Sequence, residues 1–240
     1  MAAWAGIDNF DSYGDGDLHG ESGGSGWSDA WGGSTAYDVQ GTTTFGGSTK
    51  AVQHDTSSTG TIVRTLTSSV DSGDLYYAIR TDDASLDGIQ FEIQDGATLG
   101  GAVSFENDGG ATYQIRVSTH AVADILESLA ADTWYIININ FVSSTQFKVR
   151  AKVEGGSFNA YSSDLTYINS VNNPDRLDMT SFPIGSGQVN LYIDEIGTTD
   201  PDAAAAGPAA LKTLDTIAAA SIKTIDGVAI ASVKTWNTIA

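Results

Sequence analysis

Phe147-Lys148-Val149-Arg150-Ala151-Lys152-Val153 is the stretch that decides the fold. Apolar and basic residues alternate along it, so the four apolar side chains are expected to face a core and the three basic side chains to face water. A period of two residues is typical of a half-buried strand in an antiparallel sheet. The stretch therefore predicts a β-sheet that is covered by a hydrophobic core on one face and open to water on the other.

The segments around this stretch also predict strands. The first half of Ile136–Phe141 is almost entirely apolar. This indicates a central strand that is covered by an opposing sheet on one face and by side chains or loops on the other. One helix is predicted over Ala121–Leu129, with a loop draped across the sandwich as the alternative. Strands do not alternate with long helices, which disfavours doubly wound α/β folds. Strands are predicted at 51–53, 61–67, 75–80, 88–94, 102–106, 112–117, 133–142, 146–154 and 189–196.

The composition excludes several classes of function. The chain has 240 residues, of which 30 are acidic and 11 basic, and its formal net charge is −19. Such a charge repels phosphate backbones and anionic headgroups, so nucleic acid and membrane surfaces are not expected partners. No stretch approaches the roughly 20 apolar residues of a membrane span. The absence of cysteine excludes disulfides, thiolate metal sites and cysteine catalysis.

Several motifs occur in an order that resembles a known family. Asp8-Asn9-Phe10-Asp11-Ser12-Tyr13, the glycine-rich Gly23–Trp27 followed by Trp31, Thr133-Trp134-Tyr135 and Tyr192–Gly197 stand in sequence over about residues 7–198. Together they resemble the first, a central and the closing strand of laminin-G-like, concanavalin A-like jelly-roll domains. The resemblance implies an all-β fold, an antiparallel β-sandwich, for residues 1–198.

The last thirty residues repeat with a period of eleven, in the units Leu211–Ser221, Ile222–Ser232 and Val233–Ala240. A short unit that cannot bury its own apolar face implies stacking on copies. Asp226-Gly227 is a strong hairpin signal, and glycine costs a helix about 1 kcal/mol relative to alanine. We therefore expect strands of about seven to nine residues with turns at 215–216, 226–227 and 237–238, rather than a right-handed coiled coil.

This repeat segment predicts the context of the protein. Residues 199–210 read as an Ala/Pro linker that leads to residues 211–240. The repeats resemble the Lys-x-x-Asn-Gly-Val-Ala repeats at the ends of virion proteins of tailed bacteriophages, which implies a capsid-decoration, head-fibre or tail-fibre role. Partners would be further copies of the chain, a phage capsid or tail protein, or both. With no signal peptide, we expect synthesis in the host cytoplasm and a place on the virion surface, or alternatively outside a cell. The residues expected to carry assembly are Ile222, Ile225, Val228, Ile230, Val233 and Trp236.

Three aspartates are candidates for a calcium site. In the calcium-binding members of the family that the chain resembles, the ion often ties the first strand to the last, and the matching carboxylates are Asp8 or Asp11 together with Asp194, plus backbone carbonyls. Asp15 and Asp17 in the neighbouring loop are further candidates. The alternative is that these side chains cap turns or face solvent, as Asp often does. Ca²⁺ is the only cofactor that the sequence suggests.

Aromatic residues are candidates for glycan binding. Exposed rings stack on pyranose faces while Asp, Asn and glycine-rich loops supply hydrogen bonds, and Trp27, Trp31 and Tyr76 are available for this role. Core packing is the alternative, above all for Trp27, because large aromatics in sandwiches are mostly buried. A host surface glycan would then be the ligand of a carbohydrate-binding adhesion module.

Catalysis is not expected. The laminarinase group of concanavalin A-like glycosidases carries a Glu-x-Asp-x-x-Glu strand, whereas the nearest string here, Phe91–Asp95, lacks the second Glu and reverses the order. No nucleophile elbow accompanies His19, His54 or His120. The leading hypothesis is a non-enzymatic phage structural protein, the first alternative is the adhesion module, and a glycan hydrolase or lyase is the weakest alternative.

Overall fold

The computed structural model describes residues 2–55, 59–83, 88–107, 113–120, 125–181, 190–203, 224–225 and 228–229. The chain divides into two compact units, Met1–Asp202 and Ala203–Ala240. None of the described residues forms a helix, and so none forms one long and apolar enough to cross a membrane. The strands of the first unit are β1 (Ala2–Ala3), β2 (Gly16–Asp17), β3 (Gly32–Gly33), β4 (Tyr37–Gln40), β5 (Ala51–Asp55), β6 (Gly60–Thr65), β7 (Val70–Thr81), β8 (Ile89–Asp95), β9 (Thr98–Asn107), β10 (Tyr113–Val117), β11 (Tyr135–Ser143), β12 (Gln146–Val153), β13 (Leu165–Thr166), β14 (Arg176–Ser181) and β15 (Asn190–Gly197).

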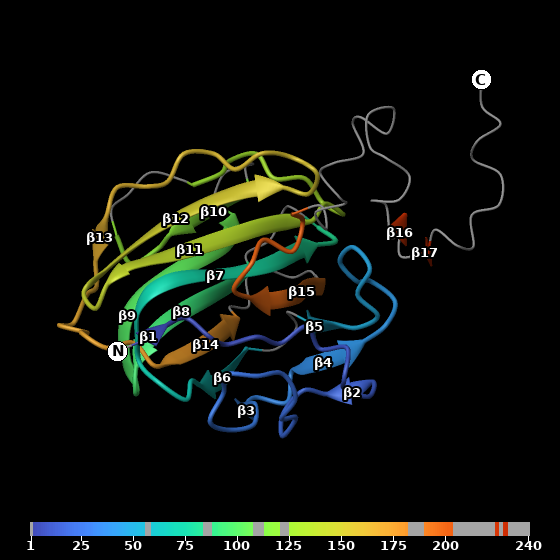
Figure 1. Cartoon of the computed structure of the whole chain (residues 1–240), viewed down its shortest axis with the longest axis horizontal. Coiled ribbons are helices and arrows are strands. Elements are labelled where there is room, and N and C mark those ends of the chain that lie inside the picture. Colours follow the sequence, from blue (N-terminus) through green and yellow to red (C-terminus); the bar gives the residue numbers. More distant parts are fainter. Residues whose placement is uncertain are drawn as a thin grey trace. The chain divides into compact units, whose positions relative to one another are not determined.

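The strands of the first unit form two sheets (Figure 1). The larger sheet has the order β13-β12-β11-β7-β15-β5-β4-β2, with β1 joined to β7 in parallel. The smaller sheet has the order β10-β9-β8-β14-β6-β3, and its strand pairs are antiparallel, as are the other pairs of the larger sheet. The predicted antiparallel β-sandwich is therefore confirmed.

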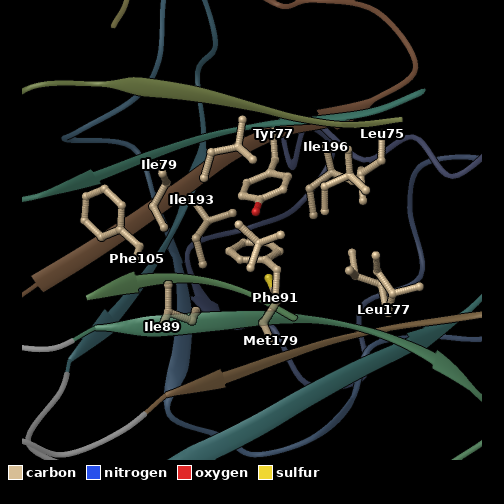
Figure 2. Packing of buried hydrophobic residues seen from close by; sticks show 14 of the residues in the cluster. Leu75, Tyr77, Ile79, Ile89, Phe91, Phe105, Leu177, Met179, Ile193 and Ile196 are labelled. Atoms are coloured by element: carbon tan, nitrogen blue, oxygen red, sulfur yellow. The ribbon is translucent and has the colours of Figure 1, made fainter. Parts of the chain in front are cut away.

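The core lies between the inner faces of the two sheets (Figure 2). Tyr77 of β7 stacks on Phe91 of β8 with ring centroids 3.9 Å apart, which joins the centres of the two layers. Nearer one edge, Phe147 of β12 reaches Gly101 of β9, where a Cβ atom would lie 2.7 Å from the phenyl Cζ. Glycine is needed at this position because a side chain would displace the ring.

The alternation that predicted the fold holds over most of its length. Phe147, Val149 and Ala151 are fully buried, as expected. The pattern fails at the end of β12, where Lys152 is 5% exposed and Val153 is 42% exposed. Two carboxylates that follow β15 in the sequence bind the Lys152 ammonium group and bury it, which an alternation rule cannot foresee.

The outer face of the larger sheet is also covered, as predicted for the strand at 136–141. A second apolar cluster lies on this face. Phe45, from the loop after β4, contacts Trp134 edge-on at 5.6 Å between ring centroids, and Phe158, from the loop after β12, lies 6.1 Å from Tyr76. Residues from two loops therefore cover this part of the outer face, as predicted.

Each of the nine predicted strands is present, with bounds that differ by a few residues. The sequence missed β4, β14 and the two-residue strands of the first unit. The helix prediction is wrong for residues 125–129, and residues 121–124 lie outside the described part. Leu126 instead forms a bridge with Ile115 of β10, and Ile125 and Leu129 pack into the core. This agrees with the alternative of a loop draped across the sandwich.

The described residues of the second unit form a hairpin. Strands β16 (Thr224–Ile225) and β17 (Val228–Ala229) pair in antiparallel register, with Ile225 opposite Val228. The three turns predicted at 215–216, 226–227 and 237–238 lie outside the described residues.

Candidate functional site

Asp8 is the centre of a buried polar network. Its side chain is 1% exposed, and its Oδ2 atom lies 2.6 Å from Nη1 of Arg64, a guanidinium that is itself buried. The same oxygen accepts hydrogen bonds from Tyr13 Oη at 2.6 Å and Trp31 Nε1 at 2.9 Å. A buried carboxylate that is already paired with a guanidinium has no charge left for a second cation. This contact disagrees with the predicted calcium role of Asp8.

The other two predicted calcium ligands do meet. Asp11 Oδ1 accepts the hydroxyl of Ser48 at 2.9 Å, and the same hydroxyl lies 3.4 Å from Oδ1 of Asp194. Asp11 also accepts the backbone N–H groups of Thr49 and Lys50, and these bonds outweigh partial burial and lower its pKa. The loop after β4 thereby joins a residue near the N-terminus to the last strand of the sandwich.

Asp194 is the least stable carboxylate of this group in its charged form. Its side chain is fully buried, and burial raises its pKa to about 8 despite hydrogen bonds from the N–H groups of Phe45 and Glu195. Glu195 lies beside it in the left-handed backbone region, with φ of 54°, at a register shift in β15. Burial, and then the charge of Asp11, raise the pKa of Glu195 as well.

The oxygen atoms around Asp194 are of the kind that binds a hard cation, but there are fewer of them than such an ion needs. Carboxylate and hydroxyl oxygens are the ligands that Ca²⁺ prefers, and six to eight are needed. In the described part of the chain, no group of three or more His, Cys, Asp or Glu side chains is arranged to hold a metal ion. Asp11, Ser48 and Asp194 are thus the residues that would hold Ca²⁺, with the remaining ligands from carbonyl groups or water.

A polar cavity of about 270 Å³ lies beside Trp27, in the glycine-rich segment. The Arg64 guanidinium lies 5.0 Å from the Trp27 ring centroid and 5.4 Å from that of Trp31. Trp27 is half-buried, and its indole N–H donates to the carbonyl of Ile7 at 3.1 Å. We call this space the Trp27 cavity. Its lining is formed by Ser22, Gly23, Gly24, Trp27, Ser28, Asp29, Ala30 and Arg64.

The three predicted glycan-binding residues have different surroundings. Only Trp27 lines the cavity. Trp31 is 1% exposed and packs in the core, so its ring faces are not open to a sugar. Tyr76 is 8% exposed and lies under Phe158 on the outer face of the larger sheet. The prediction is therefore corrected for Trp31 and Tyr76, whose rings are covered by tertiary packing.

The smaller sheet brings two carboxylates together that are far apart in the sequence. Glu92 of β8 is directly opposite Asp178 of β14 on the outer face. Asp178 is 2% exposed, and both of its oxygens bind Arg176, at 2.5 and 2.7 Å. Burial raises the pKa of Asp178, although Arg176 opposes this shift. Gln94 donates to Glu92 Oε2 at 2.6 Å.

Sequence reasoning missed the two residues that give the Trp27 cavity its charge, Arg64 and Asp29. Arg64 occupies an inward position of β6 between Ile62 and Leu66. A single basic residue at an apolar position of an alternating strand was the available signal.

Of the predicted assembly residues, Ile225 and Val228 pair in the hairpin, and Ile222, Ile230, Val233 and Trp236 lie outside the described residues.

Comparisons with known proteins give similarity of fold only. No protein-family model matches the chain, and no curated protein matches it in sequence. Among solved structures, the carbohydrate esterase vb_24B_21 of the Shiga toxin-encoding bacteriophage phi24B is 15% identical over 78% of this chain and all of that chain, with a TM-score of 0.48. The catalytic domain of a glycoside hydrolase family 131 protein from Coprinopsis cinerea is 8% identical over 69% of this chain and 78% of that chain, with a TM-score of 0.46.

A third similar structure is the VIP36 exoplasmic/lumenal domain in its Ca²⁺/Man3GlcNAc-bound form. It is 10% identical over 69% of this chain and 87% of that chain, with a TM-score of 0.42. At these identities and scores no residue role is transferred, and the function has to be argued from the geometry of this chain.

Proposed function

We propose that this chain is a non-enzymatic structural protein of a bacteriophage particle, in which the β-sandwich binds a host surface glycan at the Trp27 cavity. In this proposal the C-terminal repeats mount the sandwich on the particle or join copies of it. The observation that carries the glycan role is the cavity of about 270 Å³ in which an indole meets hydroxyl, carboxylate and backbone polar groups. An apolar ring with a few converging polar groups is the usual composition of a sugar site.

The virion role is supported by the repeat segment. It forms a compact unit of its own, Ala203–Ala240, and its sequence resembles the ends of phage virion proteins. Mass spectrometry of particles purified from a host that carries this gene tests the role. The chain is expected among the virion proteins in a fixed ratio to the capsid protein, and its absence from washed particles would remove this part of the proposal.

A glycan array tests the glycan role. Wild-type protein is expected to bind a subset of glycans, and Trp27→Ala to bind them at least about fivefold more weakly, since stacking on an aromatic ring contributes about 1 kcal/mol or more. Ser22→Trp offers a second variant that fills the cavity from an exposed position and leaves the core untouched. The matched control is Phe158→Ala, a half-buried aromatic residue on the outer face of the larger sheet.

The results separate cleanly. Loss of binding in both cavity variants, with Phe158→Ala unchanged, supports the site. Binding that survives Ser22→Trp would place the glycan elsewhere, and silence of the wild type across the array would reject the glycan role.

The calcium site belongs to the same proposal as a structural element. Asp11, Ser48 and Asp194 would hold Ca²⁺, whose charge would stabilise the ionised form of the buried Asp194. The ion would thereby fix the loop after β4 to β15, and its removal should loosen this junction without altering the Trp27 cavity.

A glycan hydrolase is the second candidate function, favoured by one observation. Glu92 and Asp178 are cross-strand neighbours, and paired carboxylates are the machinery of glycoside hydrolysis. The bidentate contact from Arg176 argues against this role, because it occupies both oxygens of Asp178. A reducing-sugar assay on glycans that the protein binds decides the matter. Turnover that Glu92→Gln abolishes would make the chain an enzyme, and no turnover by the wild type leaves the binding role.

A further inference from the structure

Arg64 lines the Trp27 cavity, and its positive charge is already balanced by a buried carboxylate. The Arg64 side chain is 2% exposed, and its Nη1 atom lies 2.6 Å from the buried carboxylate of Asp8. Its Nη2 and Nε atoms donate to the carbonyl groups of Gly23 and Asp29, at 2.7 and 3.1 Å. The guanidinium therefore leaves one Nη2 hydrogen for a ligand, while its positive charge is balanced by Asp8.

The rim of the cavity carries a carboxylate, Asp29, that forms no ion pair with a described residue. Asp29 is exposed, and its Oδ1 atom accepts the backbone N–H of Thr65 at 2.9 Å. No donor from the described part of the chain binds its Oδ2 atom. Ser28 donates its hydroxyl hydrogen to the carbonyl of Thr65 at 3.2 Å, so its oxygen is left as an acceptor. The cavity thus offers mainly acceptors, which suit the hydroxyl donors of a sugar.

The wall of the cavity is held by backbone hydrogen bonds. Gly24 has φ of +74°, and a Cβ atom on it would lie 2.1 Å from the carbonyl oxygen of Ile7. Ser25 exchanges two backbone hydrogen bonds with Ile7, both 2.9 Å long, and Ser28 donates its N–H to the carbonyl of Thr65 at 2.9 Å. A wall held by backbone hydrogen bonds loses little conformational freedom on binding, which favours affinity.

The size of the cavity limits what enters it. Its volume of about 270 Å³ lies just below the lower end of the range for drug-sized ligands, roughly 300 Å³. It therefore has space for about one sugar ring.

We propose that the Trp27 cavity takes a single uncharged pyranose residue and discriminates against acidic sugars. The residue donates its hydroxyl groups to Asp29 and Ser28 and accepts the remaining Arg64 hydrogen. A uronate or sialate would bring a second negative charge next to Asp29, and the one basic side chain that lines the cavity, Arg64, is already paired with Asp8. A like-charge contact of this kind excludes the wrong ligand. This inference rests on the proposed glycan role and specifies its substrate class.

Matched sugar pairs test the discrimination. Biotin-linked glucoside and glucuronide, galactoside and galacturonide, and mannoside and mannuronide differ within each pair only at the oxidised C6 carbon. The neutral member of the bound pair is expected to bind at least about tenfold more tightly at low salt, and added salt should narrow the difference because it screens Asp29.

Two variants assign the effect to the residue. Asp29→Asn keeps an oxygen for the Thr65 N–H and removes the charge, so it should bring the acidic member to within about threefold of the neutral one. The control Asp164→Asn removes one exposed charge from a residue that does not line the cavity and should keep the preference.

The outcomes distinguish this inference from the proposed function. An acidic member that binds as tightly as its neutral partner, and depends on Trp27, overturns the inference and leaves the glycan role standing. The same holds if the array reports only acidic glycans. No binding to any pair and a silent array overturn both.

Discussion

Tyr77 is an apolar packing residue with a polar group that the fold does not use. Figure 2 shows its ring over Phe91, with the hydroxyl oxygen pointing into the core. The side chain is fully buried, and the hydroxyl has no hydrogen-bond partner in the described residues. Burial raises its pKa well above 10, because no neighbour supports the charged form. A buried hydroxyl without a partner costs stability.

Tyr77→Phe is therefore expected to raise the free energy of unfolding by about 1 kcal/mol. Urea denaturation followed by tryptophan fluorescence measures the change. The control is Tyr37→Phe, which removes a hydroxyl that donates to the Met179 carbonyl at 2.9 Å and should lower the free energy by about the same amount. A Tyr77→Phe protein less stable than the wild type would show that the hydroxyl has a partner after all.

Asp194 makes stability depend on pH in the direction opposite to an ion-paired carboxylate. Its pKa in the folded state is raised to about 8 from an ordinary value of 3.8. Its contribution to stability is complete below the unfolded value and is lost as the pH rises through the folded value. Glu195 and Asp178 are shifted in the same direction, and Asp11 and Asp202 in the opposite one.

Comparison with Asp194→Asn isolates this one residue. Between about pH 5 and about pH 8 the wild type should lose up to roughly 1 kcal/mol per pH unit relative to the variant. Thermal unfolding of both proteins at several pH values in EDTA measures the difference. A variant whose melting temperature follows the wild-type pH profile would mean that Asp194 does not titrate in this range.

Calcium should offset the loss of stability that the ionisation of Asp194 causes at high pH. At about pH 8, added Ca²⁺ is expected to raise the melting temperature of the wild type, because a ligand that binds the folded state stabilises it. The melting temperature of Asp194→Asn should change less. An equal shift in both proteins would place calcium at another site, and no shift in either would reject the calcium proposal.

At the scale of elements, ion pairs at the end of β12 fix the segment that follows β15 to the sandwich. Lys152 Nζ binds Asp200 Oδ2 at 2.7 Å and Asp202 Oδ2 at 2.9 Å, and Asp202 also accepts the N–H of Gly155 at 2.8 Å. These contacts extend the compact unit to Asp202, four residues beyond the boundary at 198 expected from the sequence. The composition of residues 199–210 predicts a linker because it has little to bury, and it gives no sign of the ion pairs that Lys152 makes.

Lys152→Met should release this junction while the sheets stay intact. Hydrogen exchange at residues 198–203 is expected to become roughly fivefold faster or more, which corresponds to about 1 kcal/mol of local stability. Lys148→Met is the matched control, since Lys148 is on the same face of the same strand and has no ion pair with a described residue. Mass spectrometry of peptic peptides gives the rates, and equal rates in all three proteins would mean that Lys152 does not hold the junction.

Two elements show where local sequence patterns fail. β14, Arg-Leu-Asp-Met-Thr-Ser, contains no β-branched aliphatic or aromatic residue, and its strand state depends on pairing with β8 and β6 on both sides. Residues 125–129 have helical apolar spacing, but Ser128 adopts φ of 60° and the segment pairs with β10. In both cases tertiary pairing outweighs local propensity.

At the scale of the whole molecule, the two compact units predict independent folding of the first. A chain that ends at Ala203 should unfold cooperatively with the free energy of the sandwich in the full chain, within about 0.5 kcal/mol. A chain that ends at Gly197 lacks the partners of Lys152 and should be less stable by about 1 kcal/mol. Denaturation of the three proteins gives the comparison, and an unfolded 1–203 chain would show that the repeats belong to the core.

Light scattering on the same proteins reports assembly. If the repeats join copies of the chain, the full chain is an oligomer and the 1–203 chain a monomer. If both the full chain and the 1–203 chain are monomers, the repeats are expected to bind a capsid or tail protein instead. An oligomer that survives truncation would assign self-association to the sandwich and contradict the proposed role of the repeats.

The sequence by itself determined the class of fold and most of the strands. These features depend on local regularities: alternation with a period of two and β-branched runs between turn residues. Through a resemblance in the order of motifs it also placed Asp11 near Asp194, two residues that Ser48 joins in the structure.

Only the tertiary structure decided which of these residues are free to act. It paired Asp8 with Arg64, buried Trp31 and Tyr76, set Glu92 beside Asp178, and surrounded the Trp27 cavity with groups from two distant segments. The physical reason is that exposure and charge compensation are properties of neighbours in space. Residues such as Arg64 and Asp8 are 56 positions apart, and no periodicity along the chain encodes their contact.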